Sequence, residues 1–138
     1  MVLAHQEITG QWWDNCRSSY LLYTSEIVIQ EAKQGDPDAA ERRMNLLKEI
    51  PLLSIIQDIE RLARRYMTEL CFPQKSVADS LHLAYAVYYG MDYLLTWNCT
   101  HLANEFLQRK IVTINNTLSL PTPLIVTPED LILTDEEV

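Results

Sequence analysis

The sequence predicts an α/β fold with a short parallel sheet. Short apolar runs with the character of buried strands alternate with longer segments in which apolar residues recur every three or four positions. Strands and helices that alternate in this order form parallel sheets covered by helices. The length of 138 residues, with 48% of them hydrophobic, suits one packed domain, which we assign to residues 1–134.

The first third of the chain predicts two helices separated by a strand. Apolar residues recur every four positions within residues 2–16, and this spacing predicts a helix with one buried face. Residues 20–23 are apolar and aromatic, which is typical of a buried strand. A short helix over residues 26–33 follows, and Gly35 closes it.

The middle of the chain predicts three further helices. Asp36 can cap a helix and Pro37 suits its first turn, so the next helix begins there. Residues 55–70 have the most regular helical repeat in the sequence. Residues 76–89 are apolar nearly all round, as in a helix that packs deeply between a sheet and its neighbours, and Gly90 ends it.

The last part of the chain predicts three more strands and one helix. Residues 92–96 form the second strand of the chain, residues 98–108 a helix, residues 111–114 a third strand and residues 124–126 a short fourth strand. Residues 135–138 form an acidic tail outside the domain.

The charge balance is acidic and limits the partners of the chain. Nineteen acidic and eleven basic residues give a net charge of −8, which repels nucleic acid unless a metal ion or a local basic patch intervenes. The three cysteines form no C-x-x-C pair, so the pattern supports neither a disulfide framework nor a zinc ribbon. No apolar run reaches the roughly 18 residues of a membrane helix, and the first residues do not form a secretion signal. We therefore expect a cytoplasmic protein that does not bind membranes.

Two carboxylates are the strongest candidates for a functional site. In an open parallel sheet the ligand lies beyond the carboxyl ends of the strands, which directs attention to Glu31, in the helix after the first predicted strand. Asp79 lies in the first turn of the buried helix. A hard cation such as Mg²⁺ takes oxygen ligands from a few carboxylates and from water, so the two residues together predict a metal site. The alternatives are that Asp79 forms a capping box with Ser76 and that Glu31 is a solvated helix residue.

His82 and Asn98 complete the candidate site. His82 follows Asp79 by one helical turn and can orient a carboxylate or a substrate, although a histidine in an apolar helix also serves as a hydrogen-bonded core residue. Asn98 follows the strand over residues 92–96, at the predicted ligand edge. Zinc is disfavoured because too few further cysteines and histidines accompany Cys99 and His101.

Basic residues concentrate in two adjacent predicted helices of this acidic chain. If they share one face, that face can hold an RNA backbone. Acidic residues are interleaved with them, so an ordinary solvated face is the alternative interpretation. The basic residues are Arg42, Arg43, Lys48, Arg61, Arg64 and Arg65.

Several motifs surround the candidate site. Residues 78–86 (ADSLHLAYA) contain the pattern D-x-x-H-x-A on a predicted helix, and residues 90–104 continue with a strand that ends L-L-T-W-N-x-x-H-L. Together with residues 25–32 (SEIVIQEA) and 127–131 (TPEDL), this arrangement resembles the PIN domain family. The resemblance is strongest to the VapC-like type II toxins and their bacterial relatives, and it extends over nearly the whole chain.

The resemblance implies a three-layer α/β/α fold and a ribonuclease that depends on Mg²⁺ or Mn²⁺. By position, Glu31 matches the acidic residue after the family's second strand, and Asp79 matches the aspartate of the buried helix. Asn98 matches a position that is often Asp, and His82 or Asn98 would orient neighbouring groups. The family also implies an RNA substrate, a cognate antitoxin protein as partner, and a homodimer.

The chain departs from the family pattern in two places. PIN domains open with a central strand that carries the first acidic ligand, in a pattern like Y-(L/I)-(D/E)-T-S, whereas residues 2–16 predict the helix that follows that strand. Glu7 belongs to this predicted helix and does not replace the ligand. Asn98 replaces a charged ligand by a neutral one, which weakens metal binding because hard cations favour carboxylates.

These observations predict a PIN-like metal-dependent ribonuclease, the toxin component of a toxin-antitoxin pair, that is impaired because the first strand and its acidic ligand are missing. The alternative is a non-catalytic PIN remnant that acts as a protein-binding module. An unrelated regulatory domain of the receiver type is disfavoured, because the sequence shows no aspartate at a strand end with a partnering lysine.

Overall fold

The chain combines helices with short parallel strands, which confirms the predicted α/β class. The structure is a computed structural model that describes residues 2–3, 17–96, 105–127 and 130. Within these residues, no helix has the length and apolar character needed to cross a bilayer.

The strands pair in parallel, in two groups. β1 (Val2–Leu3), β4 (Tyr93–Leu95) and β5 (Leu124–Val126) form one sheet with β4 in the middle. β2 (Thr24–Ser25) pairs with β3 (Leu52–Leu53). β1 also contacts β2, so β1 lies between β2 and β4. The strands therefore follow one another in the order β3, β2, β1, β4, β5.

The position of β1 corrects two predictions. Val2 and Leu3 pair with Leu94 and Leu95 of β4, so the chain does not enter a helix at residue 2. A strand therefore lies between β2 and β4, where the sequence predicted that a first strand was missing. Two apolar residues cannot be assigned to strand or helix by periodicity, and the pairing with a buried strand decides between them. The remainder of the predicted helix, residues 4–16, lies outside the described residues.

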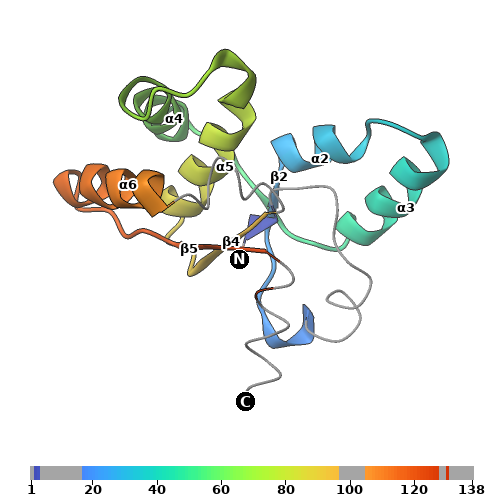
Figure 1. Ribbon diagram of the computed structural model, residues 1–138. Helices are drawn as coiled ribbons and strands as arrows, with labels where there is room; N and C mark the ends of the chain where they lie inside the picture. Colours follow the sequence, from blue (N-terminus) through green and yellow to red (C-terminus); the bar gives the residue numbers. More distant parts are fainter. Residues whose placement is uncertain (1, 4–16, 97–104, 128–129, 131–138) are drawn as a thin grey trace.

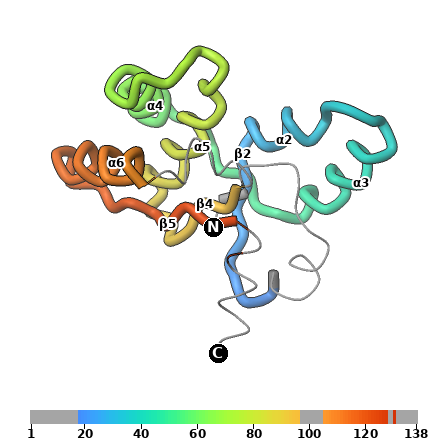
Figure 2. Tube along the Cα trace, in the orientation of Figure 1, coloured from blue at the N-terminus to red at the C-terminus, as the bar shows by residue number. Residues whose placement is uncertain are grey.

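Helices surround these strands, with α4 and α6 on one side and α2 and α3 on the other (Figure 1). Figure 2 shows the chain crossing from α3 to α4 through β3, between the two sides. Two short 3₁₀ turns, at Arg17–Ser19 and Gln74–Ser76, precede β2 and α5. The helices are α2 (Glu26–Ala32), α3 (Pro37–Leu47), α4 (Gln57–Glu69), α5 (Val77–Tyr88) and α6 (Glu105–Thr117).

The four helices predicted between residues 26 and 89 are confirmed. Asp36 caps α3, because its carboxylate accepts a hydrogen bond from the Ala39 amide at 3.0 Å. Gly35 (φ +83°) and Gly90 (φ +65°) follow α2 and α5 in the left-handed backbone conformation, which glycine adopts without steric cost.

The strand predictions were less accurate. The strand predicted over residues 20–23 instead forms at Thr24 and Ser25, and β3 was not predicted because it has only two residues. The strand predicted over residues 111–114 is wrong, since these residues belong to α6. Ile111 and Ile114 are buried one helical turn apart, so helical spacing overrides the preference of β-branched residues for strands. The strands predicted around β4 and β5 are confirmed.

Two hydrophobic cores lie on opposite faces of β4. Leu94 packs in one core with side chains of α4, α5 and α6. Leu95 packs in the other with side chains of α2 and α3, and Tyr93 lies against that second core. Successive strand residues point to opposite faces of a sheet, so both faces of β4 are covered by helices.

A buried polar network joins α4, α6 and the segment before β5. The Tyr66 hydroxyl donates a hydrogen bond to the Asn115 side-chain oxygen, and the Asn115 amide donates to the Thr122 hydroxyl at 2.8 Å. Tyr66 and Asn115 are both fully buried. Burial raises the pKa of Tyr66, and the hydrogen bond with Asn115 opposes this shift only in part.

The raised pKa of Tyr66 predicts a loss of stability at alkaline pH. Above the ordinary tyrosine pKa of about 10, the unfolded chain releases the phenol proton while the folded chain retains it. The contribution of Tyr66 to the free energy of unfolding is therefore complete below that pH. Above it, this contribution falls by up to about 1.4 kcal/mol per pH unit. Urea unfolding between pH 8 and pH 11 should show a shallower decline for Tyr66→Phe than for the wild type; equal slopes would contradict the prediction.

Candidate functional site

Hydroxyl side chains mark the carboxyl ends of three strands. Ser25 ends β2, Thr96 follows β4 and Thr127 follows β5, and all three residues are buried. The Ser25 hydroxyl accepts a hydrogen bond from the Val28 amide at 3.4 Å and thereby caps α2. Sequence reasoning missed this polar rim, although a Ser or Thr at the end of each apolar run was its visible signal.

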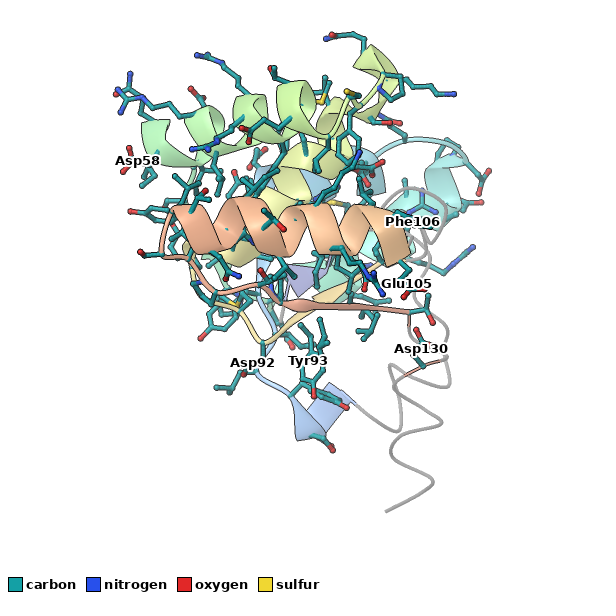
Figure 3. All side chains as sticks on the ribbon, turned by 60° about the vertical axis from the view of Figure 1, so that its left-hand side comes forward. Asp58, Asp92, Tyr93, Glu105, Phe106 and Asp130 are labelled. Atoms are coloured by element: carbon teal, nitrogen blue, oxygen red, sulfur yellow. The ribbon has the colours of Figure 1, made fainter. Side chains whose placement is uncertain are left out.

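Acidic groups also lie at this edge. Beyond β5, the Thr127 amide donates to the Asp130 carboxylate at 3.0 Å, and the Asp130 amide donates to the Thr127 hydroxyl at 3.1 Å. Figure 3 shows Asp130 at the same end of the molecule as Glu105, the first residue of α6. Asp92 precedes β4 and lies away from this end.

The central contact of the candidate site joins α2 to α5. The Glu31 carboxylate lies 2.7 Å from Nε2 of His82, a hydrogen-bond distance. The two residues are 51 positions apart in the chain. The His82 side chain is 2% exposed and the Glu31 side chain is 22% exposed, so the contact extends from the core to the surface.

The surrounding sequence explains why the two helices approach each other. α2 begins directly after β2, so it starts at the carboxyl end of that strand. α5 contacts α2, β1 and β4, and its Ala84 and Ala86 are completely buried. These small side chains allow neighbouring elements to lie close to α5, and Ala32 of α2 is equally buried.

Asp79 lies one helical turn before His82 and is half-buried. Residues three apart on a helix share a face, with about 5–6 Å between their Cβ atoms, so Asp79 is on the side of α5 that carries the Glu31 contact. The Ser76 hydroxyl makes no capping hydrogen bond at the start of α5, so the serine half of the alternative capping box is not formed. The structure thus shows His82 in contact with Glu31, with Asp79 one turn earlier on α5.

The other predicted site residue is not located. Asn98 lies outside the described residues, as do Cys99 and His101. The residues that follow β1 in the sequence are Ala4 and His5, neither of which supplies a carboxylate.

The carboxylates of Glu31 and Asp79 suit a hard cation that binds weakly. Within the described part of the chain, no three Cys, His, Asp or Glu side chains lie close enough to hold an ion together. Glu31 and Asp79 supply anionic oxygens, and Mg²⁺ binds through one or two carboxylates while it keeps several water molecules. The pair thus fits Mg²⁺ or Mn²⁺ better than zinc, which requires a closed set of nitrogen and sulfur ligands.

Three buried polar atoms have no hydrogen-bond partner among the described residues. They are the His82 Nδ1 atom and the hydroxyl oxygens of Thr24 and Tyr85. Burial raises the pKa of Tyr85, and neighbouring phenol and carboxylate groups raise it further.

Three of the arginines make local contacts. Arg43 donates hydrogen bonds to the carbonyl oxygens of Ala32 and Gln34, at 3.1 and 2.5 Å. Arg65 pairs with Glu69 at 2.9 Å and Arg61 with Asp58 at 3.5 Å, each within α4. These three arginines are engaged locally, which favours the solvated-face interpretation.

Comparison of the chain with protein-family models, curated proteins and solved structures finds no match.

Proposed function

We propose that this chain is a PIN-like, metal-dependent ribonuclease of the cytoplasm, the toxin component of a toxin-antitoxin pair, with a weakened metal site. The observation that carries the proposal is the 2.7 Å contact between Glu31 and His82. This contact brings Glu31 of α2 to the side of α5 on which Asp79 lies. The contact supports a metal site shared by these two carboxylates, which are far apart in the sequence.

The strand arrangement adds support. β1 lies between β2 and β4, which is the central position of the first strand in the family that the sequence resembles. Helices cover both faces of β4, consistent with three layers. The carboxyl ends of the strands, where open parallel sheets bind ligands, carry polar side chains.

The metal ligands that the chain offers predict weak metal binding. Glu31 and Asp79 would hold the ion, and the chemistry that such an ion supplies is neutralisation of phosphodiester charge and activation of water. With no carboxylate directly after β1 and with Asn98 in place of an acid, the chain has fewer charged ligands than the family pattern. We therefore expect slow cleavage of RNA.

A cleavage assay tests the function. Labelled single-stranded RNA incubated with the purified protein and Mn²⁺ should be cut slowly, and the cleavage should stop with EDTA. Asp79→Asn should reduce the rate at least about tenfold, because a charged metal ligand becomes neutral. Asp92→Asn, at the beginning of β4, is the matched control and should leave the rate unchanged. Cleavage at the wild-type rate in Asp79→Asn, or cleavage that continues in EDTA, would contradict the proposal.

The second candidate function is a non-catalytic protein-binding module. It is favoured by the finding that the described residues contain no group of three metal-binding side chains. A protein of net charge −8 attracts a basic partner such as an antitoxin segment, with or without catalysis. Absence of cleavage at every Mn²⁺ concentration, together with binding of a basic antitoxin, would favour the module.

A further inference from the structure

We propose that His82 is a positioning residue that holds the Glu31 carboxylate in place for a divalent cation. This inference rests on the metal site of the proposed function and assigns a separate role within it. His82 does not coordinate the ion itself. It acts through Glu31, in the way that hydrogen-bond partners behind metal ligands orient those ligands in other proteins.

The geometry of the pair supports this role. The distance of 2.7 Å between Nε2 and the Glu31 oxygen is short for a nitrogen-oxygen hydrogen bond, as expected when the acceptor is charged. An ionised carboxylate can only accept hydrogen bonds, so Nε2 is the donor. One oxygen of Glu31 is thereby fixed, and the carboxylate keeps a second oxygen with which to bind a ligand.

The two partners differ in how firmly the structure holds them. The His82 ring belongs to a helix whose residues from Leu83 to Val87 are all buried, and it is 1% exposed as a residue. Glu31 is a long side chain near the surface, and without a partner it would sample several rotamers. A rigid donor from the core can therefore select one of these rotamers.

Stability alone does not explain a histidine here. Nδ1 of His82 is buried and has no hydrogen-bond partner within the described residues, which is unfavourable in the folded state. Water can solvate the partly exposed Glu31 carboxylate without any help from His82. An apolar side chain at position 82 would avoid the unpartnered nitrogen, so the arrangement is better explained by its effect on Glu31.

Two substitutions of His82 separate positioning from packing. His82→Gln retains an amide nitrogen near the place of Nε2, whereas His82→Leu fills the space without a donor. The dissociation constant for Mn²⁺, measured by the electron paramagnetic resonance signal of the free ion, should rise about 10- to 100-fold in His82→Leu. In His82→Gln it should stay within about threefold of the wild type, since the donor is kept. Tyr66→Phe, which perturbs a buried hydrogen bond elsewhere, is the control for general destabilisation and should bind Mn²⁺ as the wild type does.

Each result of these experiments supports or overturns the positioning role of His82. An unchanged Mn²⁺ affinity in a folded His82→Leu protein would overturn the positioning role and leave the proposed function intact. Absence of Mn²⁺ binding in the wild type would overturn both. If His82→Leu does not fold, the ¹⁵N resonances of the His82 ring in the wild type decide instead. They should show a protonated Nε2 whose shift changes in Glu31→Gln; a ring insensitive to that substitution would overturn the inference.

Discussion

Replacing Asn115 by leucine should destabilise the protein by about 3 kcal/mol, because the substitution leaves buried polar groups without partners. Asn115 is completely buried and bonds on one side to the Tyr66 hydroxyl and on the other to the Thr122 hydroxyl. Leucine has a similar size, so the loss of hydrogen bonds outweighs any cavity effect. Urea unfolding at pH 7 measures the change in the free energy of unfolding.

A double substitution tests whether the loss arises from the Tyr66 contact. Tyr66→Phe alone should cost about 1 kcal/mol, and the double variant Tyr66→Phe with Asn115→Leu should cost less than the sum of the two single changes. The reason is that removing both partners leaves no orphaned phenol in the core. Strict additivity would show that the hydrogen bond between the two side chains contributes nothing.

Glu31→Gln should weaken Mn²⁺ binding at least about tenfold, since one of two charged ligands is lost. Glu26→Gln is a matched control: it removes the same charge from the same helix, at an exposed residue in the first turn of α2. Mn²⁺ at a concentration near the dissociation constant of the wild type should raise the melting temperature of the wild type and of Glu26→Gln more than that of Glu31→Gln.

The comparison of the two glutamates also separates a specific site from general charge. The chain carries a net charge of −8 and attracts cations wherever acidic residues gather. If Glu26→Gln weakens Mn²⁺ binding as much as Glu31→Gln does, the binding is diffuse and the proposed site is wrong.

Most helices could be predicted because local signals agree with the final packing. In α3, the Asp36 cap and Pro37 identify the start, and the structure forms the expected capping hydrogen bond. In α6, local signals conflict with packing. Ile111 and Val112 belong to a β-branched run, but the burial of Ile111 and Ile114 follows the helical period.

The shortest strands could not be predicted for a different reason. β1 and β3 have two residues each, which is too few for any periodicity. They are strands only because a parallel neighbour supplies hydrogen bonds, and that neighbour lies far along the chain. This information is tertiary and is absent from any local window.

The candidate site was predicted in part. The spacing of Asp79 and His82 already placed them on one helix face, and the position of Glu31 after the first predicted strand singled it out. The 2.7 Å contact between Glu31 and His82 depends on how α2 packs against α5, which spacing does not report. The contact changes the interpretation of His82, which is neither a fully satisfied core residue nor an isolated candidate.

The most direct test of the account is where a dilute paramagnetic ion settles on the folded protein. In a backbone amide spectrum, sub-stoichiometric Mn²⁺ should broaden the signals near Glu31 and those near Asp79 and His82 together, because the two helices share one site. Broadening confined to the exposed acids Asp36 and Asp38, or to one of the two helices alone, would contradict it.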